Sequence, residues 1–390
     1  MGQVLDNIMQ FADEIREGGV EGEKLMRLSD GNAKRLRDSG VIRMLAPKEF
    51  GGLEAHPREF AETAMGIGAI DGSTGWVSGI VGVHPWEMAF FDPKVQQEVW
   101  GEDVDTWIAS PYAPMGIAVP VDGGYILNGK WSFSTGNDHC KWVMIGALVG
   151  NEKGVPTGKV LHVLVPKSDY TVDPESWDVV GLRGTGSKDF TVSGAFVPEY
   201  RTIDSEIVMS GNGAKHAGRD ETLYKFPFSC IFPLGITSSL IGMCEGGLAL
   251  YINAQKERVA VTGVPIKNDP YVLYAIGQAA DEINASRVAI LETVDRFWDK
   301  AEKGQEVTFE ERSIGRRTQT NAAWRAVSAL DEIFARAGGG AMKVKLPLQR
   351  FWRDAHVGLT HAIHVPGSIN HASALTQLGG EPEGIMRSMI

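Results

Sequence analysis

Two histidines and a pair of neighbouring hydroxyls are the side chains of this sequence best suited to chemistry at neutral pH. His361 lies in the segment RFWRDAHVGLTHAIHVPGSINH, residues 350 to 371. An imidazole has an ordinary pKa near ~6.5 and can therefore carry a proton at working pH. His84 lies in the segment VHPW, where the next residue is a proline that bends the chain. Ser134 and Thr135, in the segment WSFSTG, each carry a hydroxyl that can donate or accept a hydrogen bond.

The segment around His361 predicts a helix of about five turns between Pro347 and Pro366, because proline is tolerated in the first turn of a helix and breaks its interior. One face of this helix would carry Arg350, Asp354, Val357 and His361. His361 is therefore expected in a polar, partly buried stripe. A histidine in such a stripe can have its hydrogen bonds satisfied within the core, or it can contact a cofactor.

Composition places the chain among ordinary soluble globular proteins, with 43% hydrophobic and 22% charged residues. Its 390 residues exceed the roughly 250 to 300 that one core usually serves, so we expect two or three domains. The net charge of -11 argues against nucleic acid and anionic membranes as partners, since both favour basic surfaces. The three scattered cysteines fit a reducing compartment, and the N-terminus does not resemble a signal peptide.

Residues 1–105 are predicted to form a helical N-terminal domain. A first helix is expected to end at the Gly18-Gly19 pair, since its apolar stripe consists of Val4, Ile8, Phe11 and Ile15. Ser73 or Thr74 is expected to cap a later helix that is apolar all round and therefore buried. This helix should stop near His84, because the following proline disfavours helical backbone at the residue before it.

Residues 106–225 are predicted to form a central antiparallel β domain with a connecting loop. Asp122-Gly123 and Asn128-Gly129 are the two strongest hairpin signals in the chain. The apolar segments WVMIGALVG (142–150) and KVLHVLVP (159–166) predict further strands.

Residues 226–390 are predicted to form a C-terminal four-helix bundle. Its helices can be drawn near residues 233–259, 268–302, 309–337 and 347–365, with a break at Gly338-Gly339-Gly340. The most apolar segment, residues 234–254, contains Glu245 and four glycines, which favours a packed helix over a membrane span. An α+β chain with helical, β and four-helix parts in this order has the arrangement of the acyl-CoA dehydrogenase fold.

Six motifs carry a resemblance that covers nearly the whole chain. The chain resembles the flavin-dependent monooxygenases built on the acyl-CoA dehydrogenase fold, and within them the oxygenase components of two-component aromatic hydroxylases. It looks most like those that act on the phenolic seco-steroid of bacterial cholesterol catabolism, whereas the p-hydroxyphenylacetate 3-hydroxylases look more distant. The motifs are GSTGWVSGIVGVHPW (72–86), EVWGED (98–103), SPYAPMGIAVPVDGGYILNGKWSFSTGNDH (110–139), VGLRGTGSKD (180–189), FVPEYR (196–201) and RFWRDAHVGLTHA (350–362).

The resemblance implies which residues meet the flavin. It places His361 beside the isoalloxazine ring, with Trp131, Ser134 and Thr135 among the contacts to the flavin edge. Serine is more usual than threonine in relatives at position 135, so Thr135 is a small departure. Arg258 and Gly339 are expected near the flavin phosphate, partly across a subunit boundary, because a guanidinium binds phosphate through a planar fork and glycines allow close approach.

The resemblance also implies a substrate site. His84 would take or share the proton of a phenol, which makes the aromatic ring a better nucleophile. Ser110 and Tyr112 would orient the substrate hydroxyl. A histidine that only caps a helix is the alternative interpretation of His84.

Reduced FMN or FADH2 is the implied cofactor, used with O2 as a diffusible co-substrate through a C4a-hydroperoxyflavin. The sequence lacks a dinucleotide-binding fingerprint, so a separate NAD(P)H-dependent reductase is expected to supply the reduced flavin. The resemblance further implies a small aromatic substrate, a homotetramer and a cytoplasmic location.

Three alternatives stay open. An acyl-CoA dehydrogenase-like oxidoreductase is weakened because the segment THAIH, residues 360–364, lacks the glutamate base that many such enzymes carry there. Oxidation of nitrogen or sulfur on the same scaffold, and a catalytically silent flavin-binding protein, are the others. No metal site is predicted, because no carboxylate joins the C-terminal histidines at ligand spacing; these are His356, His361, His364 and His371.

Overall fold

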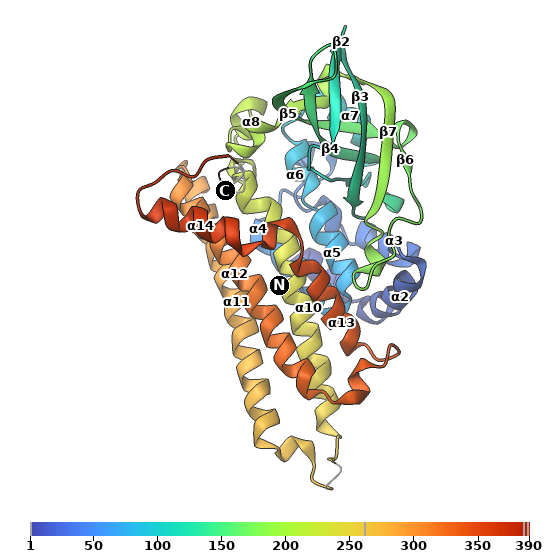
Figure 1. Ribbon diagram of the computed structural model, residues 1–390, viewed down its shortest axis with the longest axis vertical. Helices are drawn as coiled ribbons and strands as arrows, with labels where there is room; N and C mark the ends of the chain where they lie inside the picture. Colours follow the sequence, from blue (N-terminus) through green and yellow to red (C-terminus); the bar gives the residue numbers. More distant parts are fainter. Residues whose placement is uncertain (1, 261–262, 385–386, 388–389) are drawn as a thin grey trace.

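A computed structural model describes residues 2–260, 263–384, 387 and 390. It confirms the predicted fold class, with N-terminal helices, a central sheet and a C-terminal bundle in that order. Figure 1 shows the sheet at one end of an elongated molecule and the long bundle helices at the other, with α4 (Pro57–Ile70) and α5 (Gly72–Val81) between them. Short helices, α8 (Ser205–Met209) and α9 (Gly213–Ala217), connect the sheet to the bundle.

The N-terminal helices differ from the prediction in two respects. The first predicted helix is two helices, and the second continues through Gly18 and Gly19, where a Cβ would overlap the side chains of Asn32 and Asp71. These glycines therefore allow close packing and do not end a helix. The helices besides α4 and α5 are α1 (Gln3–Met9), α2 (Ala12–Leu25), α3 (Asp30–Asp38), α6 (His84–Met88) and α7 (Pro93–Trp100).

Helix α5 is buried along its whole length, as predicted. Its cap is Asp71, whose Oδ2 accepts from the backbone N–H of Thr74 at 2.9 Å, so the predicted caps Ser73 and Thr74 were wrong. The helix ends at Val81, and His84 begins the short helix α6, where Pro85 is accepted within the first turn. His84 is thus the first residue of a helix instead of the last.

The eight-stranded sheet has the order β6-β7-β3-β2-β4-β5-β8, with β1 paired to β4. The pairs β1–β4 and β2–β4 are parallel, so the sheet is mixed and the purely antiparallel prediction was wrong in this respect. The strands are β1 (Ile108–Ala109), β2 (Gly116–Val121), β3 (Gly124–Ser134), β4 (Trp142–Gly150), β5 (Pro156–Pro166), β6 (Thr171–Val172), β7 (Lys188–Pro198) and β8 (Thr202–Asp204).

The two predicted hairpins had different outcomes. Asp122-Gly123 joins β2 to β3, with Val121 opposite Gly124. Asn128-Gly129 lies inside β3, where the pairing to β7 shifts register between Leu127 and Asn128. The dipeptide there sits at an irregularity of the β-bulge type in a continuous strand and makes no turn.

The bundle confirms the four predicted helices, α10 (Phe228–Lys256), α11 (Pro270–Glu302), α12 (Phe309–Arg336) and α13 (Leu348–Leu359), followed by α14 (Pro366–Gln377). Among the described residues, only α10 is long and apolar enough to cross a membrane, but 89% of its apolar window is buried, as in a core helix. It packs so closely on α5 that a Cβ at Gly79 or Gly235 would overlap the backbone of the other helix. Helix α13 is shorter than predicted and ends before His361.

Asp354 links α13 to the loop between β6 and β7. Its Oδ1 accepts from the backbone N–H of Leu182 at 2.6 Å, and on the same helix face Arg350 pairs with the α5 cap Asp71 at 3.3 Å. Burial raises the pKa of Asp354 to about 7, although the bond from Leu182 opposes this shift.

Asp354 should make folding stability fall as pH rises. Its native pKa of about 7 exceeds the ordinary value of about 3.9, so the native state binds more protons between these values. Urea unfolding should therefore show a loss of about 2 to 3 kcal/mol between pH 5 and pH 8 that is absent from Asp354→Asn. Asp178→Asn, on the surface, is the control. Equal pH dependence in Asp354→Asn and wild type would contradict the prediction.

Candidate active site

His84 is held in one tautomer. It is fully buried, and its Nδ1 lies 2.6 Å from the carbonyl oxygen of Ile108. Because a carbonyl only accepts, Nδ1 carries the hydrogen and Nε2 is left with a lone pair. Nε2 has no hydrogen-bond partner among the described residues. Burial lowers the pKa of His84 to about 4, so the ring is neutral at physiological pH.

Tyr112 lies beside His84, as expected, and Ser110 lies two residues earlier in the same segment. The chain leaves β1 after Ala109, next to the carbonyl that fixes His84, and passes through both residues. The Tyr112 ring meets the His84 ring edge-on at 5.7 Å between centroids, and Ser110 is buried. Burial, together with the charge and hydrogen-bonding capacity of Glu87, raises the pKa of Tyr112 well above its ordinary value. The phenol therefore stays protonated.

A carboxylate and an imidazole that were not singled out from the sequence, Glu87 and His162, lie next to Tyr112. Glu87 Oε1 lies 2.5 Å from His162 Nδ1, and both side chains are almost fully buried. His162 packs against Tyr112 at 4.9 Å between ring centroids. The available signals were a histidine inside the apolar strand segment KVLHVLVP and a glutamate three residues after His84. The pair joins β5 to α6, and nothing in the sequence indicates that these elements touch.

His361 lies beyond the end of α13 and not on its polar face. It caps the 3-10 turn η10 (Ala362–His364), where its Nδ1 accepts from the backbone N–H of Ile363 at 3.3 Å. Nε2 therefore carries the hydrogen of the neutral ring. The partly exposed ring meets Trp76 of α5 edge-on at 5.8 Å. Burial, and then the charge of Arg316, lowers the pKa of His361 to about 4, below the ordinary histidine value from which the sequence argument started.

The two adjacent hydroxyl residues are both buried, Ser134 with no exposed surface and Thr135 with 3%. The Oγ of Ser134 accepts from Asn137 Nδ2 at 2.7 Å. The amide of Asn137 is oriented by Lys167, which donates to Oδ1 at 2.6 Å. An enclosed hydroxyl gives no support to the predicted contact between Ser134 and the flavin. Phe133, the residue before it, is 70% exposed and has a positive φ of 67°.

Thr135 ends a directed chain of hydroxyls. Thr185 lies 2.9 Å from the carbonyl oxygen of Leu182 and must donate to it. Ser187, 2.7 Å from Thr185, then donates to Thr185, and Thr135, 2.8 Å from Ser187, donates to Ser187. The hydroxyl hydrogen of Thr135 is used in the bond to Ser187, so a ligand could use Thr135 only as a hydrogen-bond acceptor. Its predicted role stays a prediction, with this restriction on its polarity.

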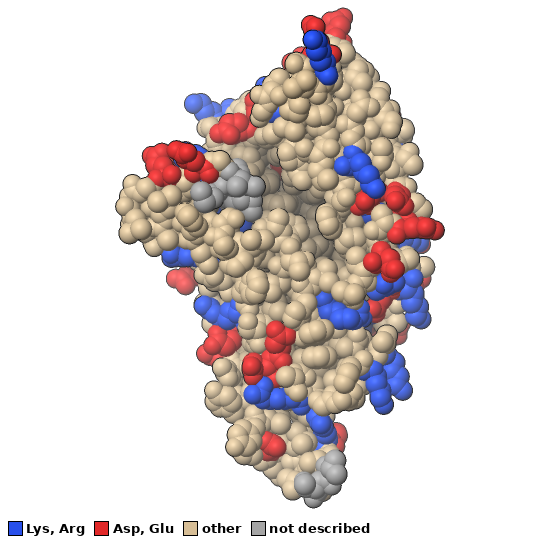
Figure 2. Space-filling view, in the orientation of Figure 1, with Lys and Arg blue, Asp and Glu red and all other residues tan. Residues whose placement is uncertain are grey.

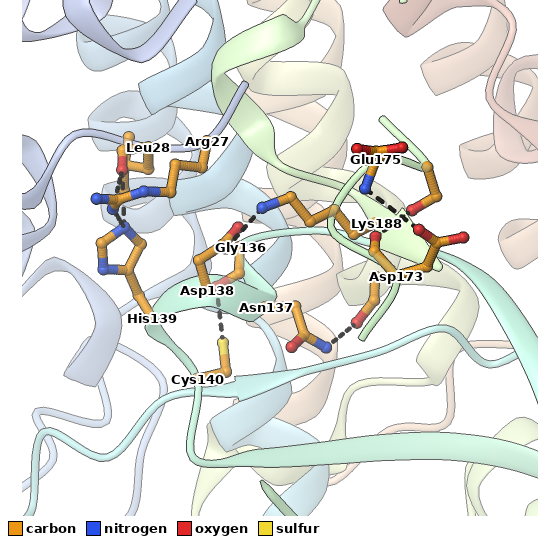
Figure 3. Close-up of polar contacts among 12 residues, drawn as sticks. Arg27, Leu28, Gly136, Asn137, Asp138, His139, Cys140, Asp173, Glu175 and Lys188 are labelled. Atoms are coloured by element: carbon orange, nitrogen blue, oxygen red, sulfur yellow. Dashed lines mark hydrogen bonds and ion pairs between the residues drawn. The ribbon is translucent and has the colours of Figure 1, made fainter. Parts of the chain in front are cut away.

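The turn after Thr135 is tied to elements on both sides (Figure 3). Lys188 of β7 donates to Asp138 at 2.7 Å, and His139 lies 2.8 Å from the carbonyl oxygen of Leu28. Arg27 lies next to the His139 ring in the same view. These contacts hold the end of β3 against the N-terminal helices, so Thr135 is presented from a fixed backbone.

The other predicted flavin contacts are not in this pocket. Trp131 is fully buried, stacks on Phe190 and donates to the Gly146 carbonyl oxygen at 2.9 Å, which leaves it no free surface. Arg258 donates to the Ala337 carbonyl oxygen at 3.0 Å beside Gly338. Gly338, with φ of 78°, leaves no room for a side chain, whereas Gly339 does.

Arg258 and His361 lie near opposite ends of α10. His364, three residues after His361, contacts Thr237 at 3.1 Å, whereas Arg258 follows the end of the helix at Lys256. The nineteen helical steps from residue 237 to residue 256 span about 28 Å at the rise of an α-helix. One chain therefore cannot bring both residues to one flavin ring and its nearest phosphate.

The pocket as a whole fits a flat aromatic cofactor. Figure 2 shows a hollow between the sheet and the adjoining end of the bundle. Three groups could meet a flat aromatic ring, namely the exposed ring of Phe133, the N–H of the partly exposed His361 and the acceptor oxygen of the buried Thr135. The Trp76 ring is itself buried and contacts the His361 ring. A flavin bound there would supply the activation of dioxygen.

Comparison with known proteins agrees with this geometry. Residues 234–366 match the family described as "Acyl-CoA dehydrogenase, C-terminal domain". A pigment production hydroxylase from Rhodococcus erythropolis is 52% identical over 391 residues, covering 100% of this chain and 99% of that protein. The oxygenase subunit HsaA of a flavin-dependent monooxygenase from Mycobacterium tuberculosis is 38% identical, covering 93% of this chain and 92% of that protein. The crystal structure of 3-HSA hydroxylase from Rhodococcus sp. RHA1 has a TM-score of 0.93 at 35% identity, covering 100% and 99% of the two chains. The chain therefore belongs to the oxygenase subunits of the flavin-dependent monooxygenases, built on the acyl-CoA dehydrogenase fold.

Proposed function

We propose that this protein is the oxygenase component of a two-component monooxygenase that hydroxylates a phenol or another electron-rich aromatic ring with reduced FMN or FADH2 and O2. The observation that carries the proposal is the bare Nε2 of His84, buried and without a partner among the described residues. A substrate hydroxyl that donates to this nitrogen shares its proton with the imidazole, which raises the electron density of the ring. Ser110 and Tyr112 position that hydroxyl.

At the cofactor end, His361 can donate a hydrogen bond from Nε2 and Thr135 can accept one. His361 would therefore bind an acceptor atom of the flavin edge, and Thr135 a donor atom. Arg258 and the Gly338–Gly340 segment would then meet the phosphate of a flavin bound by another subunit, and the proposal includes a homotetramer. A resorcinol hydroxylase from Rhizobium that is 30% identical is named as FADH2-dependent and as an oxygenase component. A separate NAD(P)H-dependent flavin reductase and a cytoplasmic location complete the proposal.

The test supplies the full-length protein with a flavin reductase, NADH, FMN or FAD, and 18O2. A panel of phenols, indoles and thioethers is then screened by mass spectrometry. A phenol that gains one labelled oxygen supports the proposal, and labelling only at nitrogen or sulfur would replace it with heteroatom oxidation. Bleaching of oxidised flavin by an acyl-CoA, without any labelled product, would instead show a dehydrogenase.

A further inference from the structure

We propose that Arg316 is a positioning residue for His361, because it holds the turn that carries this histidine and so fixes which nitrogen of the imidazole is left to donate. The inference rests on the proposed function, in which that nitrogen meets the flavin. It gives a role to a buried cation of the bundle that the proposed chemistry does not otherwise use. Arg316 lies on helix α12, and only 1% of its surface is exposed.

Arg316 reaches His361 through a single residue, Ile363. The guanidinium of Arg316 donates to the Ile363 carbonyl oxygen at 2.8 Å, and the backbone N–H of Ile363 donates to His361 Nδ1 at 3.3 Å. Arg316 also donates to Gln319 Oε1 at 2.8 Å and makes a further contact. Because Ile363 is held at its carbonyl, its N–H keeps a fixed direction. Nδ1 of His361 therefore stays the acceptor, and the single hydrogen of the neutral ring stays on Nε2.

Two more residues of α12 donate to the same turn, η10. Thr320 donates to the Ile363 carbonyl oxygen at 3.3 Å, and Trp324 Nε1 donates to the His364 carbonyl oxygen at 2.8 Å. Arg316, Thr320 and Trp324 follow one another at intervals of four residues and therefore lie on one face of the helix. This row of donors satisfies carbonyl groups just beyond the end of α13, where helical hydrogen bonding has stopped.

The opposite side of the turn is held by His364. Its Nδ1 lies 3.0 Å from the Gly358 carbonyl oxygen and must donate to it, so its Nε2 accepts from the Thr237 hydroxyl at 3.1 Å. Burial, more than neighbouring charge, lowers the pKa of His364 to about 3, so this ring is neutral. The turn is thus joined to α10 and α13 by neutral groups and to α12 by a cation.

The charge of Arg316 supports the same arrangement. After burial, it is the second cause that lowers the pKa of His361 to about 4. A protonated ring would carry a hydrogen on Nδ1, facing the N–H of Ile363, and the cap of the turn would be lost. Of the other groups at the ring, His364 is neutral and Trp76 is uncharged. A neutral donor in place of Arg316 could bond to the same carbonyl but would lack this second effect.

The first test observes the His361 ring directly and needs no turnover. Full-length protein labelled with 15N-histidine is studied by solid-state NMR from pH 5 to pH 8, and the His361 signals are those that disappear in His361→Asn. In wild type we expect a neutral ring with its hydrogen on Nε2 across the upper part of this range. A hydrogen on Nδ1 of the wild-type neutral ring would overturn the proposal, and this measurement decides even if no Arg316 variant folds.

Two substitutions separate the charge of Arg316 from its hydrogen bond. Arg316→Gln keeps a side chain that can donate and removes the charge, so the midpoint of the His361 titration should rise by about half a pH unit or more. Arg316→Lys keeps the charge and should leave the midpoint near the wild-type value. Arg325→Gln removes a surface arginine of the same helix, paired with Glu282 at 3.5 Å, and is the control. A midpoint that does not move in Arg316→Gln would overturn the proposal.

The second test measures product formed per O2 consumed. In Arg316→Gln this ratio should fall by about tenfold or more, because a hydrogen bond from a charged donor no longer holds the turn. Arg316→Lys should retain more of it than Arg316→Gln, and Thr320→Val should lower it less. Thr318→Val removes a hydroxyl that bonds within its own helix, to the Ile314 carbonyl oxygen at 3.0 Å, and should match wild type. A wild-type ratio in Arg316→Gln would contradict the positioning role.

The outcomes separate this inference from the proposed function. If no phenol gains oxygen, the proposed hydroxylase activity fails, while the NMR titration still decides how Arg316 acts on His361. If phenols are hydroxylated but the His361 ring titrates alike in wild type and Arg316→Gln, the activity stands and only the role of Arg316 is overturned.

Discussion

Replacement of His361 by alanine is expected to lower substrate hydroxylation by about 100- to 10,000-fold, the range typical of a lost general acid or base. The physical reason is the fixed tautomer, in which Nδ1 accepts from Ile363 and Nε2–H is left to donate toward the cofactor. Without that donor, reduced flavin should be oxidised with release of hydrogen peroxide instead of product. The measurement is the amount of product and of peroxide formed per O2 consumed.

Two further variants separate catalysis from folding. His361→Asn keeps a side-chain acceptor that can cap η10, so its local structure should persist while hydroxylation stays low. His356→Ala removes a partly exposed histidine of α13 that pairs with Asp331 at 3.1 Å, and it should behave like wild type. Normal coupling of O2 to product in His361→Ala would remove this residue from the cofactor end of the site.

The sequence predicted the helices of the bundle well because their apolar patterns are long and regular. It also predicted the Asp122-Gly123 hairpin, where local turn chemistry and strand pairing agree. Asn128-Gly129 failed because the pairing of β3 with β7 continues across it, and the sheet outweighs the preference of a dipeptide. Likewise, α13 ends before His361, whose side chain caps the following turn, although the spacing of polar residues continues past Leu359.

Part of the site could be anticipated from the sequence, but its electrostatics could not. His84 and Tyr112 come together as expected, yet the neutral state of His84 follows from its burial, which periodicity does not reveal. The same limit applies to Glu87 and His162, which lie far apart in the sequence and meet only where α6 packs on β5. The enclosure of Ser134 was also unpredictable, because it depends on Asn137 in the turn that follows.

His84→Ala should also lower hydroxylation by about 100- to 10,000-fold, but by a different route. Binding of reduced flavin and consumption of O2 should stay near wild-type values, since His84 acts on the substrate and not on the cofactor. Product per O2 consumed should therefore collapse. The exposed His216 provides a control in His216→Ala, and retained hydroxylation in His84→Ala would show that the pocket does not need this base.

The pH dependence of hydroxylation gives an independent test of His84. Its pKa is lowered to about 4 by burial, and protonation would place a hydrogen on Nε2 and remove the acceptor. The rate in wild type should thus be flat, with respect to this group, from pH 6 to pH 8 and should fall only as pH approaches 4. A rise with a midpoint near ~6.5, the ordinary value for histidine, would instead show that the ring is hydrated in the working enzyme, and the argument from its buried lone pair would be lost.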